Sequence, residues 1–270
     1  MLCACKNQSD SISAVTREEG SGTRNSFCEI LNIVSENDRD GITPDAEVTN
    51  STAVMIHSVS GYKNAIGYIS SGSMSKLVKA VKIDGVLPTA QNITDGKYPV
   101  TREFLLVTGG DLSDGAEDFM KFVFSSQGAQ IIQKCGFVPT KSPSNSYSAS
   151  LGRDRKYIVN ISGSTSVAPI IDAMAEAYMD LNPGASVEIQ QNGSSAGIHD
   201  VLENVSEIGM SSRSLTQSEI KSGITSSVVA FDGIAVIVNH SNPVSDLTSG
   251  QVRSIFNGNV KEWSCLEELN

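Results

Sequence analysis

"SISAVTREEGSGTRNSFCEILNIV" spans residues 11–34 and passes from a short apolar stretch, through glycine and hydroxyl residues, into a helical pattern. From Phe27 onward, apolar residues recur at i, i+3, i+4 and i+7, as on one face of a helix, and "SISAV" before the turn indicates a strand. "TREEGSGTR" (16–24) is therefore predicted to be a strand-to-helix turn. Free N–H groups and the helix dipole favour an anion at such a place, although an ordinary capped helix start has the same composition.

The composition limits what an anion site could serve. With 270 residues, the chain holds one large domain or two of ordinary size. Its longest apolar runs, "GIAVIV" and "FLLV", are too short to span a bilayer. The net charge is −10 and no basic cluster occurs, which argues against nucleic acid and anionic membrane surfaces as partners. Because an acidic chain repels anions at long range, a site would have to rely on local, buried hydrogen-bond donors.

The five cysteines lack the spacing of a metal site, and no motif indicates a cofactor, so we predict neither a metal nor a cofactor. "MLCAC" (1–5) has the leucine and alanine of a lipoprotein cleavage site before its second cysteine. It lacks the charged and apolar regions of a signal peptide, so it is only a weak indication of export.

Strand and helix patterns alternate along the chain. Strands are predicted at 12–15, 53–57, 65–69, 104–108, 157–161, 186–190, 228–231 and 234–239, and helices at 24–35, 73–80, 115–134, 168–181, 197–205 and 248–256. This alternation predicts an α/β fold with helices on both faces of its sheets. Residues 140–157, "TKSPSNSYSASLGRDRKY", lack a period and are rich in Ser, Pro and Asn, which is typical of an exposed, mobile linker.

The strand–turn–helix pattern occurs twice more. Residues 157–181 place "GSTS" between a strand and a helix, and residues 186–205 place "GSSAG" in the same context. Loops at the carboxyl ends of strands line the ligand crevice of open α/β sheets. Three such turns can surround one tetrahedral oxyanion, with Arg17 adding a bidentate contact. None of them has the spacing of a nucleotide P-loop.

Seven segments carry a family resemblance. They are "TREEGSGTR", "IGYISSG" (66–72), "CGFVPT" (135–140), "GSTSVAP" (163–169), "NGSSAG" (192–197), "IGMSSRSL" (208–215) and "IFNGNVKEW" (255–263). They resemble the signature segments of the periplasmic phosphate-binding proteins that serve ABC transporters. The resemblance covers nearly all of residues 12–140 and 157–270.

The resemblance implies an α/β fold of the two-lobed periplasmic-binding-protein type, with a mixed sheet flanked by helices in each lobe and the ligand cleft between the lobes. One lobe would comprise 1–102 with 237–270. The other would comprise 103–236, including the linker 140–157.

The segments stand in an unusual order. In the family, "GSTSVAP" opens the chain and "CGFVPT" lies near its end, whereas here the later half comes first. The chain therefore resembles a circular permutation, with the old ends joined through 140–157 and new ends cut between Trp263 and Val15. A fragment spanning the junction of two tandem copies would give the same order.

The resemblance implies a set of phosphate-binding residues, carried over position by position. They are Thr165 and Ser166 from the first loop, Ser194 from the second, and Arg17, Glu19, Ser21, Gly22 and Thr23 from the central motif. Ser212 stands where the best-known members have aspartate, and Ser164 and Arg213 are secondary candidates beside these loops.

Glu19 bears on selectivity. A carboxylate facing the ligand accepts a hydrogen bond from protonated phosphate and repels sulfate, which carries no proton. The alternative is that Glu19 only pairs with Arg17 and holds it in place.

The implied function is binding of inorganic phosphate for an ABC importer, without catalysis. The implied partners are phosphate and the membrane permease, and the implied location is extracytoplasmic, with a lipoprotein anchor in the full-length form. We expect a monomer, and a dimer with exchanged halves is the alternative.

Two other classes of function stay open. One is a signalling or adhesion module that keeps the fold without the ligand. The other is a serine hydrolase, because "GSSAG" matches the nucleophile-elbow pattern around Ser195, with Asp232 and His240 following in triad order. These two flank one strand, where an extended eight-residue separation spans roughly 26 Å. That is too far for a triad unless the chain turns at Gly233.

Overall fold

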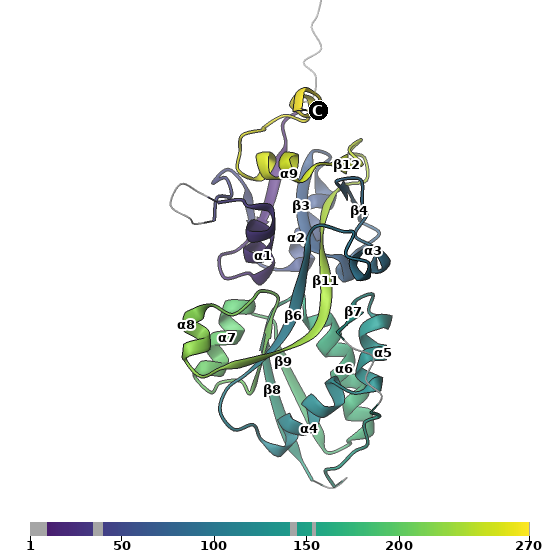
Figure 1. Cartoon of the computed structure of the whole chain (residues 1–270), viewed down its shortest axis with the longest axis vertical. Helices are drawn as coiled ribbons and strands as arrows, with labels where there is room; N and C mark the ends of the chain where they lie inside the picture. The colour runs from purple at the N-terminus through teal and green to yellow at the C-terminus, as the bar shows by residue number, and fades with distance from the viewer. Residues whose placement is uncertain (1–9, 35–39, 141–144, 153–154, 270) are drawn as a thin grey trace, which may run out of the picture.

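The computed structural model describes residues 10–34, 40–140, 145–152 and 155–269. The molecule is elongated, with two α/β lobes stacked along its long axis (Figure 1). Two strands, β6 (Thr101–Thr108) and β11 (Thr225–Asn239), pass from one lobe to the other as antiparallel neighbours. The predicted two-lobed α/β fold is confirmed. We call the lobe with α1, α2 and α9 the upper lobe and the lobe with α4 to α8 the lower lobe, as they lie in Figure 1.

The upper lobe is built on β1 and β3. Strand β1 (Ser13–Arg17) is parallel to both of its neighbours, β2 (Glu47–Thr49) and β3 (Ala65–Ser70), while β11 runs antiparallel to β3. All six residues of β3 are buried, as expected of a central strand covered on both faces. The other elements are α1 (Gly22–Leu31), α2 (Thr52–Gly61), η1 (Ser71–Ser73), β4 (Val78–Ala80), β5 (Lys82–Ile83), α3 (Ala90–Thr94), β12 (Asp246–Leu247), α9 (Ser249–Phe256) and η2 (Trp263–Leu269).

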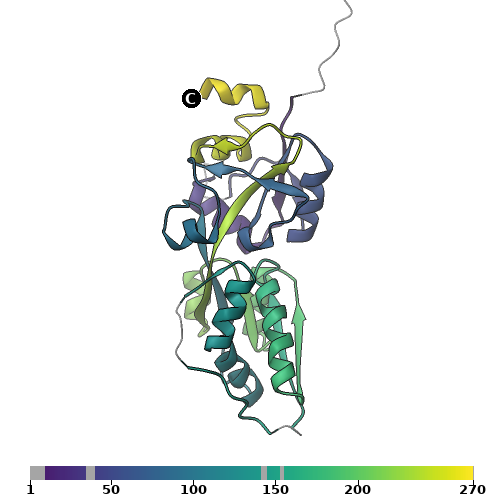
Figure 2. The same cartoon turned by 90° about the vertical axis from the view of Figure 1, so that its right-hand side faces the viewer.

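The lower lobe continues the same sheet path from β11 through β6, β10, β8 and β9. Strand β8 (Tyr157–Gly163) is parallel to β10 (Ile208–Ser211) and β9 (Ala185–Gln190), whereas β10 is antiparallel to β6. The other elements are α4 (Asp114–Val123), α5 (Ser126–Lys134), β7 (Val138–Pro139), α6 (Ala168–Leu181), α7 (Ser194–Leu202) and α8 (Gln217–Lys221). Figure 2 shows α4, α5 and α6 packed along one side of this lobe.

Each lobe has its own apolar core. In the upper lobe Phe27 stacks on Tyr68, with ring centroids 4.0 Å apart, while the lower core surrounds Tyr178. Along the chain, the core residues change lobe between Val100 and Phe104 and again between Ala230 and Ile234. Both changes fall on the crossing strands, so β6 and β11 contribute to both cores. The predicted division of residues between the lobes, with boundaries at 102 and 236, stays a prediction.

One predicted strand is a helix. Residues 53–57 lie in α2, where Ser51 caps the N-terminus by accepting the N–H of Val54 at 3.2 Å. Thr52, Met55 and Val59 are the buried residues, with helical spacing. The prediction was wrong because a short apolar run fits a strand and a buried helix equally well.

Two predicted helices also differ from the structure. Residues 73–80 end in strand β4, which pairs antiparallel with β11. Residues 115–134 form two helices, because α4 ends at Val123 and Ser125 caps the start of α5 by accepting the N–H of Gly128. In contrast, the strands predicted at 228–231 and 234–239 are parts of the single long strand β11.

The predicted linker makes contacts with the lower lobe that its composition does not indicate. The Tyr147 hydroxyl donates to the buried carboxylate of Asp118, and the Ser150 hydroxyl donates to the same group at 2.5 Å. Gln127 brackets the Tyr147 peptide, donating to its carbonyl at 3.0 Å and accepting its N–H at 2.9 Å. The described part of the linker is therefore docked on the lower lobe. Residues 141–144 and 153–154 of the linker lie outside the described residues.

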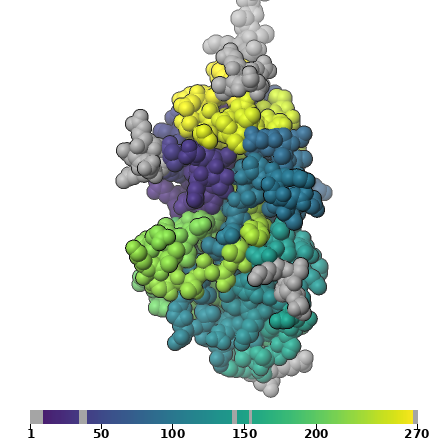
Figure 3. Space-filling view, viewed as in Figure 1, coloured from purple at the N-terminus to yellow at the C-terminus, as the bar shows by residue number. Residues whose placement is uncertain are grey.

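The two ends of the described chain lie together at the far end of the upper lobe. The Ile12 N–H donates to the Lys261 carbonyl at 2.8 Å, and the Trp263 N–H donates to the Asp10 carbonyl at 3.1 Å. The upper lobe is thus completed by residues from both ends of the sequence. On the face shown in Figure 3, the purple residues of the upper lobe lie directly against the green residues of the lower lobe.

Candidate functional site

The three glycine- and hydroxyl-rich turns meet where the lobes touch. Ser21 is the N-cap of α1 and accepts the N–H of Arg24 at 3.4 Å, while Gly193, at φ 95°, precedes α7. The N–H of Ser195 donates to the carbonyl of Gly20 at 3.1 Å, which joins a turn of the lower lobe to a turn of the upper lobe. The structure therefore brings the predicted turns together, although they are far apart in the sequence.

A cluster of serine hydroxyls lies at the centre of this meeting point. The Ser164 hydroxyl donates to the Ser212 hydroxyl at 3.0 Å, and the Ser194 and Ser212 hydroxyls are 3.3 Å apart. The Ser212 N–H also donates to the Ser194 hydroxyl at 3.1 Å. All three residues are buried. They follow β8, begin α7 and follow β10, so the sheet order of the lower lobe places them side by side.

Hydroxyls of the upper lobe meet this cluster from the other side. The Thr23 and Ser166 hydroxyls are 2.8 Å apart, and those of Thr52 and Thr165 are 3.3 Å apart. These contacts join the two lobes directly. Because a hydroxyl both donates and accepts, each pair can rearrange its hydrogen bonds around another partner.

Gly22 makes this close approach possible. A Cβ atom at this position would lie 2.3 Å from the Ser194 hydroxyl oxygen and 2.6 Å from that of Ser212. Any other residue would therefore require these hydroxyls to turn away or the first turn of α1 to shift. The N–H groups of Gly22 and Thr23, in that first turn, have no partner within the helix and are available as donors.

Arg17 is the buried cation at the site. It ends β1, is 2% exposed, and donates from Nη2 to the Thr165 hydroxyl at 3.2 Å. Its Nε and Nη2 both donate to the carboxylate of Glu18, each at 2.8 Å. The Arg17 guanidinium is thus oriented by Glu18, its neighbour in the sequence.

The position of Glu19 corrects an expectation. Glu19 is exposed in the turn after β1, and Glu18 is the residue that pairs with Arg17. The interpretation that Glu19 holds Arg17 is therefore wrong. A role of Glu19 in selecting protonated phosphate over sulfate stays a prediction.

Arg213 lies at the edge of the cluster. It donates to both carboxylate oxygens of Glu219, at 2.8 and 2.9 Å, and to the Ser195 hydroxyl at 3.1 Å. The Arg213 guanidinium lowers the pKa of Glu219 to about 2, opposed by partial burial of the carboxylate and helped by the N–H of Thr216. Arg213 is thereby held in place and contacts the α7 turn.

A second buried ion pair, which the sequence did not reveal, lies beside the site. Arg102 on β6 donates from Nε and Nη2 to one oxygen of Asp232 on β11, at 3.0 and 2.9 Å. Burial raises the pKa of Asp232, and the facing guanidinium opposes that rise. The available signal was charge at the edge of two apolar runs: Arg102 in "TREFLLV" and Asp232 in "FDGIAVIV".

Ser195, Asp232 and His240 do not form a hydrolase triad. Asp232 contacts Arg102, Ser195 accepts from Arg213, and the exposed His240 ring is hydrogen-bonded to the Lys76 carbonyl. None of the three predicted triad members contacts another in these hydrogen bonds. The serine-hydrolase interpretation therefore has no geometric support among the described residues.

The site has hydrogen-bond donors and little net charge. Among the described residues, each arginine at or beside the cluster is paired with a carboxylate: Arg17 with Glu18, Arg24 with Asp40, Arg102 with Asp232, and Arg213 with Glu219. An anion here would be recognised by hydroxyl and N–H dipoles and by one guanidinium fork. This agrees with the expectation from the acidic composition.

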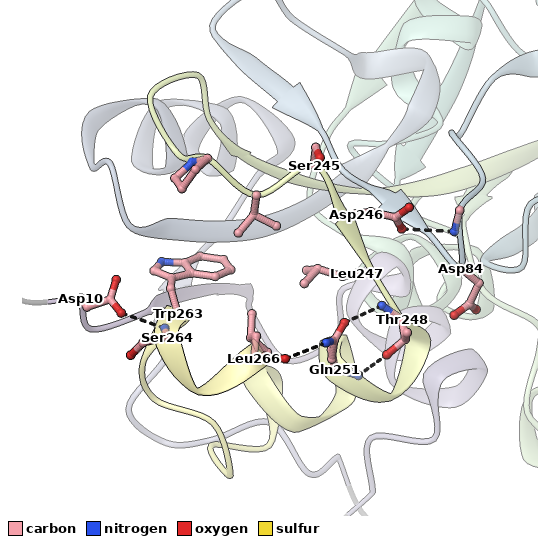
Figure 4. A pocket seen from close by; sticks show the side chains of 13 residues that line it. Asp10, Asp84, Ser245, Asp246, Leu247, Thr248, Gln251, Trp263, Ser264 and Leu266 are labelled. Atoms are coloured by element: carbon pink, nitrogen blue, oxygen red, sulfur yellow. Dashed lines mark hydrogen bonds between the residues drawn. The ribbon is translucent and has the colours of Figure 1, made fainter. Parts of the chain in front are cut away.

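A hollow of about 820 Å³ lies elsewhere, at the far end of the upper lobe beside α9 and η2 (Figure 4). Asp10, Asp84 and Asp246 line it, with Trp263 and Leu266 among its apolar residues. Each of the three carboxylates accepts a backbone N–H. Its three carboxylates make this hollow unsuitable for an anion.

In the part of the chain that the structure describes, no helix is long and apolar enough to cross a membrane. Among the same described residues, no group of three or more His, Cys, Asp or Glu residues is placed to hold a metal ion.

Comparisons with known proteins agree with the architecture. A family model described as a PBP superfamily domain matches residues 6–127 and 140–268. The phosphate-binding protein PstS 2 of Streptococcus agalactiae is 40% identical over 278 residues, which cover 99% of this chain and 94% of that protein. The crystal structure of a phosphate-binding protein of a phosphate ABC transporter from Streptococcus pneumoniae superposes with a TM-score of 0.75 at 39% identity, covering 95% of this chain and 99% of that one.

A third relative aligns over only part of the chain. The phosphate-binding protein PstS of Bacillus subtilis is 33% identical over 138 residues, which cover 49% of this chain and 45% of that protein. The Streptococcus agalactiae alignment thus covers nearly all of both chains, whereas the Bacillus alignment covers about half of each.

Proposed function

This chain belongs to the PBP superfamily, and from that premise we propose that it binds inorganic phosphate between its lobes and delivers it to an ABC importer. The observation that carries the proposal is the buried convergence of hydroxyls from both lobes with the Arg17 fork. Hydroxyls, helix N-terminal N–H groups and a guanidinium are the donors that a tetrahedral oxyanion accepts from.

We propose that the ligand is held by both lobes. The donors are the side chains of Arg17, Ser21, Thr23, Thr165, Ser166, Ser194 and Ser212, with the N–H groups of Gly22 and Thr23, and Ser164 and Arg213 in support. The hydroxyls now bonded to each other would turn towards the anion. Because the contacts come from two lobes, binding and closure of the lobes would be coupled.

The comparisons support a permuted order of segments within the chain that some relatives share. An alignment keeps the order of both sequences, so a permuted chain aligns with an unpermuted relative over only one half. The Bacillus alignment covers about half of each chain, while the Streptococcus agalactiae alignment covers nearly all of both. This favours a permutation common to such proteins over a fragment of two tandem copies.

We propose an extracytoplasmic location with a membrane permease as partner, as the family resemblance implies. A lipid anchor at Cys5 stays a prediction, because residues 1–9 lie outside the described residues. A monomer stays the prediction; the core of the upper lobe, which combines Phe27 and Trp263 from opposite ends of the chain, fits both a monomer and exchanged halves. The dimer with exchanged halves would bury the same contacts and stays the alternative.

Calorimetry of the purified protein with phosphate, sulfate, molybdate and tungstate tests the proposed function. We expect phosphate to bind and sulfate to bind more weakly. A folded protein that gives no signal with phosphate would contradict the proposal. If it also bound none of the other anions, the signalling or adhesion interpretation would be favoured. Preference for another anion would change the ligand and leave the site unchanged.

A further inference from the structure

The buried pair of Arg102 and Asp232 joins the crossing strands to both lobes. One oxygen of Asp232 accepts from Arg102. The other accepts from the Ser70 hydroxyl at 2.9 Å, and from the N–H and hydroxyl of Ser71, each at 3.1 Å. These serines stand at the end of β3 in the upper lobe. Both carboxylate oxygens of Asp232, which is fully buried, therefore accept hydrogen bonds.

Arg102 has one more contact, and it reaches the hydroxyl cluster. Its Nη1 donates to the Ser212 carbonyl at 3.4 Å, and the Ser26 hydroxyl on α1 donates to the same oxygen at 3.0 Å. The Ser212 peptide is thus held at its carbonyl by β6 and α1. The hydroxyl of the same residue, and its N–H, take part in the cluster with Ser164 and Ser194.

Stability alone does not account for this arrangement. Replacing a buried ion pair by apolar side chains of similar size is often neutral or stabilising, so such a pair is weak evidence for a stabilising role. A planar guanidinium can contact a carboxylate and a carbonyl at once in fixed directions, which a lysine ammonium cannot do. The contact with the Ser212 carbonyl is the one that links this arginine to the hydroxyl cluster.

We propose that Arg102 is a positioning residue of the phosphate site: oriented by Asp232, it fixes the Ser212 peptide so that the Ser212 hydroxyl points to the ligand. This proposal rests on the proposed function. Through Asp232, the same network ties the Ser212 loop of the lower lobe to the end of β3 in the upper lobe. Arg102 itself need not touch the anion.

The test is a double-mutant cycle on inorganic phosphate binding, measured by calorimetry. Arg102→Lys keeps a positive charge beside Asp232 and loses the hydrogen bond from Nη1 to the Ser212 carbonyl. We expect phosphate affinity to fall about tenfold, the size of one hydrogen bond to a charged group. In the Ser212→Ala background, which has no hydroxyl left to position, the same change should weaken binding less than about twofold.

Two further proteins separate positioning from folding. Arg102→Met/Asp232→Leu removes both charges and also leaves the Ser70 and Ser71 donors without their acceptor. We expect a lower melting temperature without phosphate and, in the protein that is still folded, an affinity lowered at least as much as in Arg102→Lys. Arg253→Lys is the matched control, because Arg253 on α9 also donates to a backbone carbonyl, that of Leu31 at 2.6 Å, away from the cluster. It should leave phosphate affinity unchanged.

The outcomes are distinguishable. Equal losses from Arg102→Lys in the wild-type and Ser212→Ala backgrounds would overturn the proposal, as would wild-type affinity in a folded Arg102→Lys protein. If the Arg102→Met/Asp232→Leu protein fails to fold, the cycle with Arg102→Lys still decides. A wild-type protein that does not bind phosphate would contradict the proposed function instead.

Discussion

The molecule has two buried polar clusters that are built from similar residues and differ in kind. In the lower lobe, the carboxylate of Asp118 accepts from the hydroxyls of Tyr147, Tyr178 and Ser150. Between the lobes, serine and threonine hydroxyls mainly contact one another. The first cluster has one fixed acceptor with its donors around it. The second has groups that can donate or accept.

This difference separates a structural cluster from a binding cluster. Hydrogen bonds to a charged acceptor contribute about 1.5–3 kcal/mol each, and rearranging them would leave a buried carboxylate uncompensated. Neutral hydroxyl pairs contribute only about 1 kcal/mol each and lose little when they turn to an anion, which offers stronger, charge-assisted bonds. The Asp118 cluster therefore suits the docking of the linker, and the hydroxyl cluster suits a ligand.

The largest expected effect is on the binding cluster. Arg17→Ala removes the guanidinium that donates to the Thr165 hydroxyl, and we expect phosphate affinity to fall about 100-fold. Folding should persist, because the Glu18 side chain that loses its partner is partly exposed. Calorimetry measures the affinity, and urea unfolding checks the fold. A change of less than about twofold would show that Arg17 does not contact the ligand.

The second prediction concerns the structural cluster. Asp118→Asn keeps the shape but replaces one acceptor oxygen by a donor that faces tyrosine hydroxyls. We expect a loss of about 2 kcal/mol in the free energy of unfolding, with phosphate affinity unchanged. Asp114→Asn, on the same helix but exposed beside Arg155, is the control and should change stability by less than about 0.5 kcal/mol. Weakened phosphate binding in Asp118→Asn would break the separation between the clusters.

The smallest effect is expected at the edge of the binding cluster. The folded pKa of Glu219 is about 2, below its unfolded value near 4.3, so its contribution to stability is present above about pH 4.3 and is lost as the pH falls towards 2. Glu219→Gln should therefore cost about 1 kcal/mol at pH 7, reduced by solvent screening, and nothing near pH 2. Unfolding curves of the wild type and of Glu219→Gln across this pH range measure the difference between their free energies of unfolding. A difference that persists at low pH would mean that the ion pair with Arg213 is not its source.

Much of the site could be located from the sequence, because its parts are local. Each glycine and hydroxyl turn stands between a strand and a helix of clear period, so the turns at 16–24, 163–166 and 193–197 and the position of Arg17 could be predicted. Local pattern failed at residues 53–57, where a short apolar run does not distinguish a buried helix from a strand.

The sequence alone could not show which of two neighbouring acidic residues pairs with Arg17. Glu18 and Glu19 have the same chemistry, and only the direction of the chain after β1 decides that Glu18 reaches Arg17. The hydrogen bonds of Tyr147 and Ser150 to Asp118 could not be predicted either, because the composition of the linker indicates an exposed segment and does not specify its contacts.

By itself, the sequence determined the secondary-structure alternation, the hydroxyl-rich helix starts and the acidic charge that requires a local anion site, because these depend on residues close together in the chain. The tertiary structure alone decided which residues share the site. The contacts of Thr23 with Ser166 and of Arg102 with Asp232 and Ser212 join residues more than 100 positions apart. Such pairs form only when β6 and β11 cross between the lobes, and no local preference encodes that crossing.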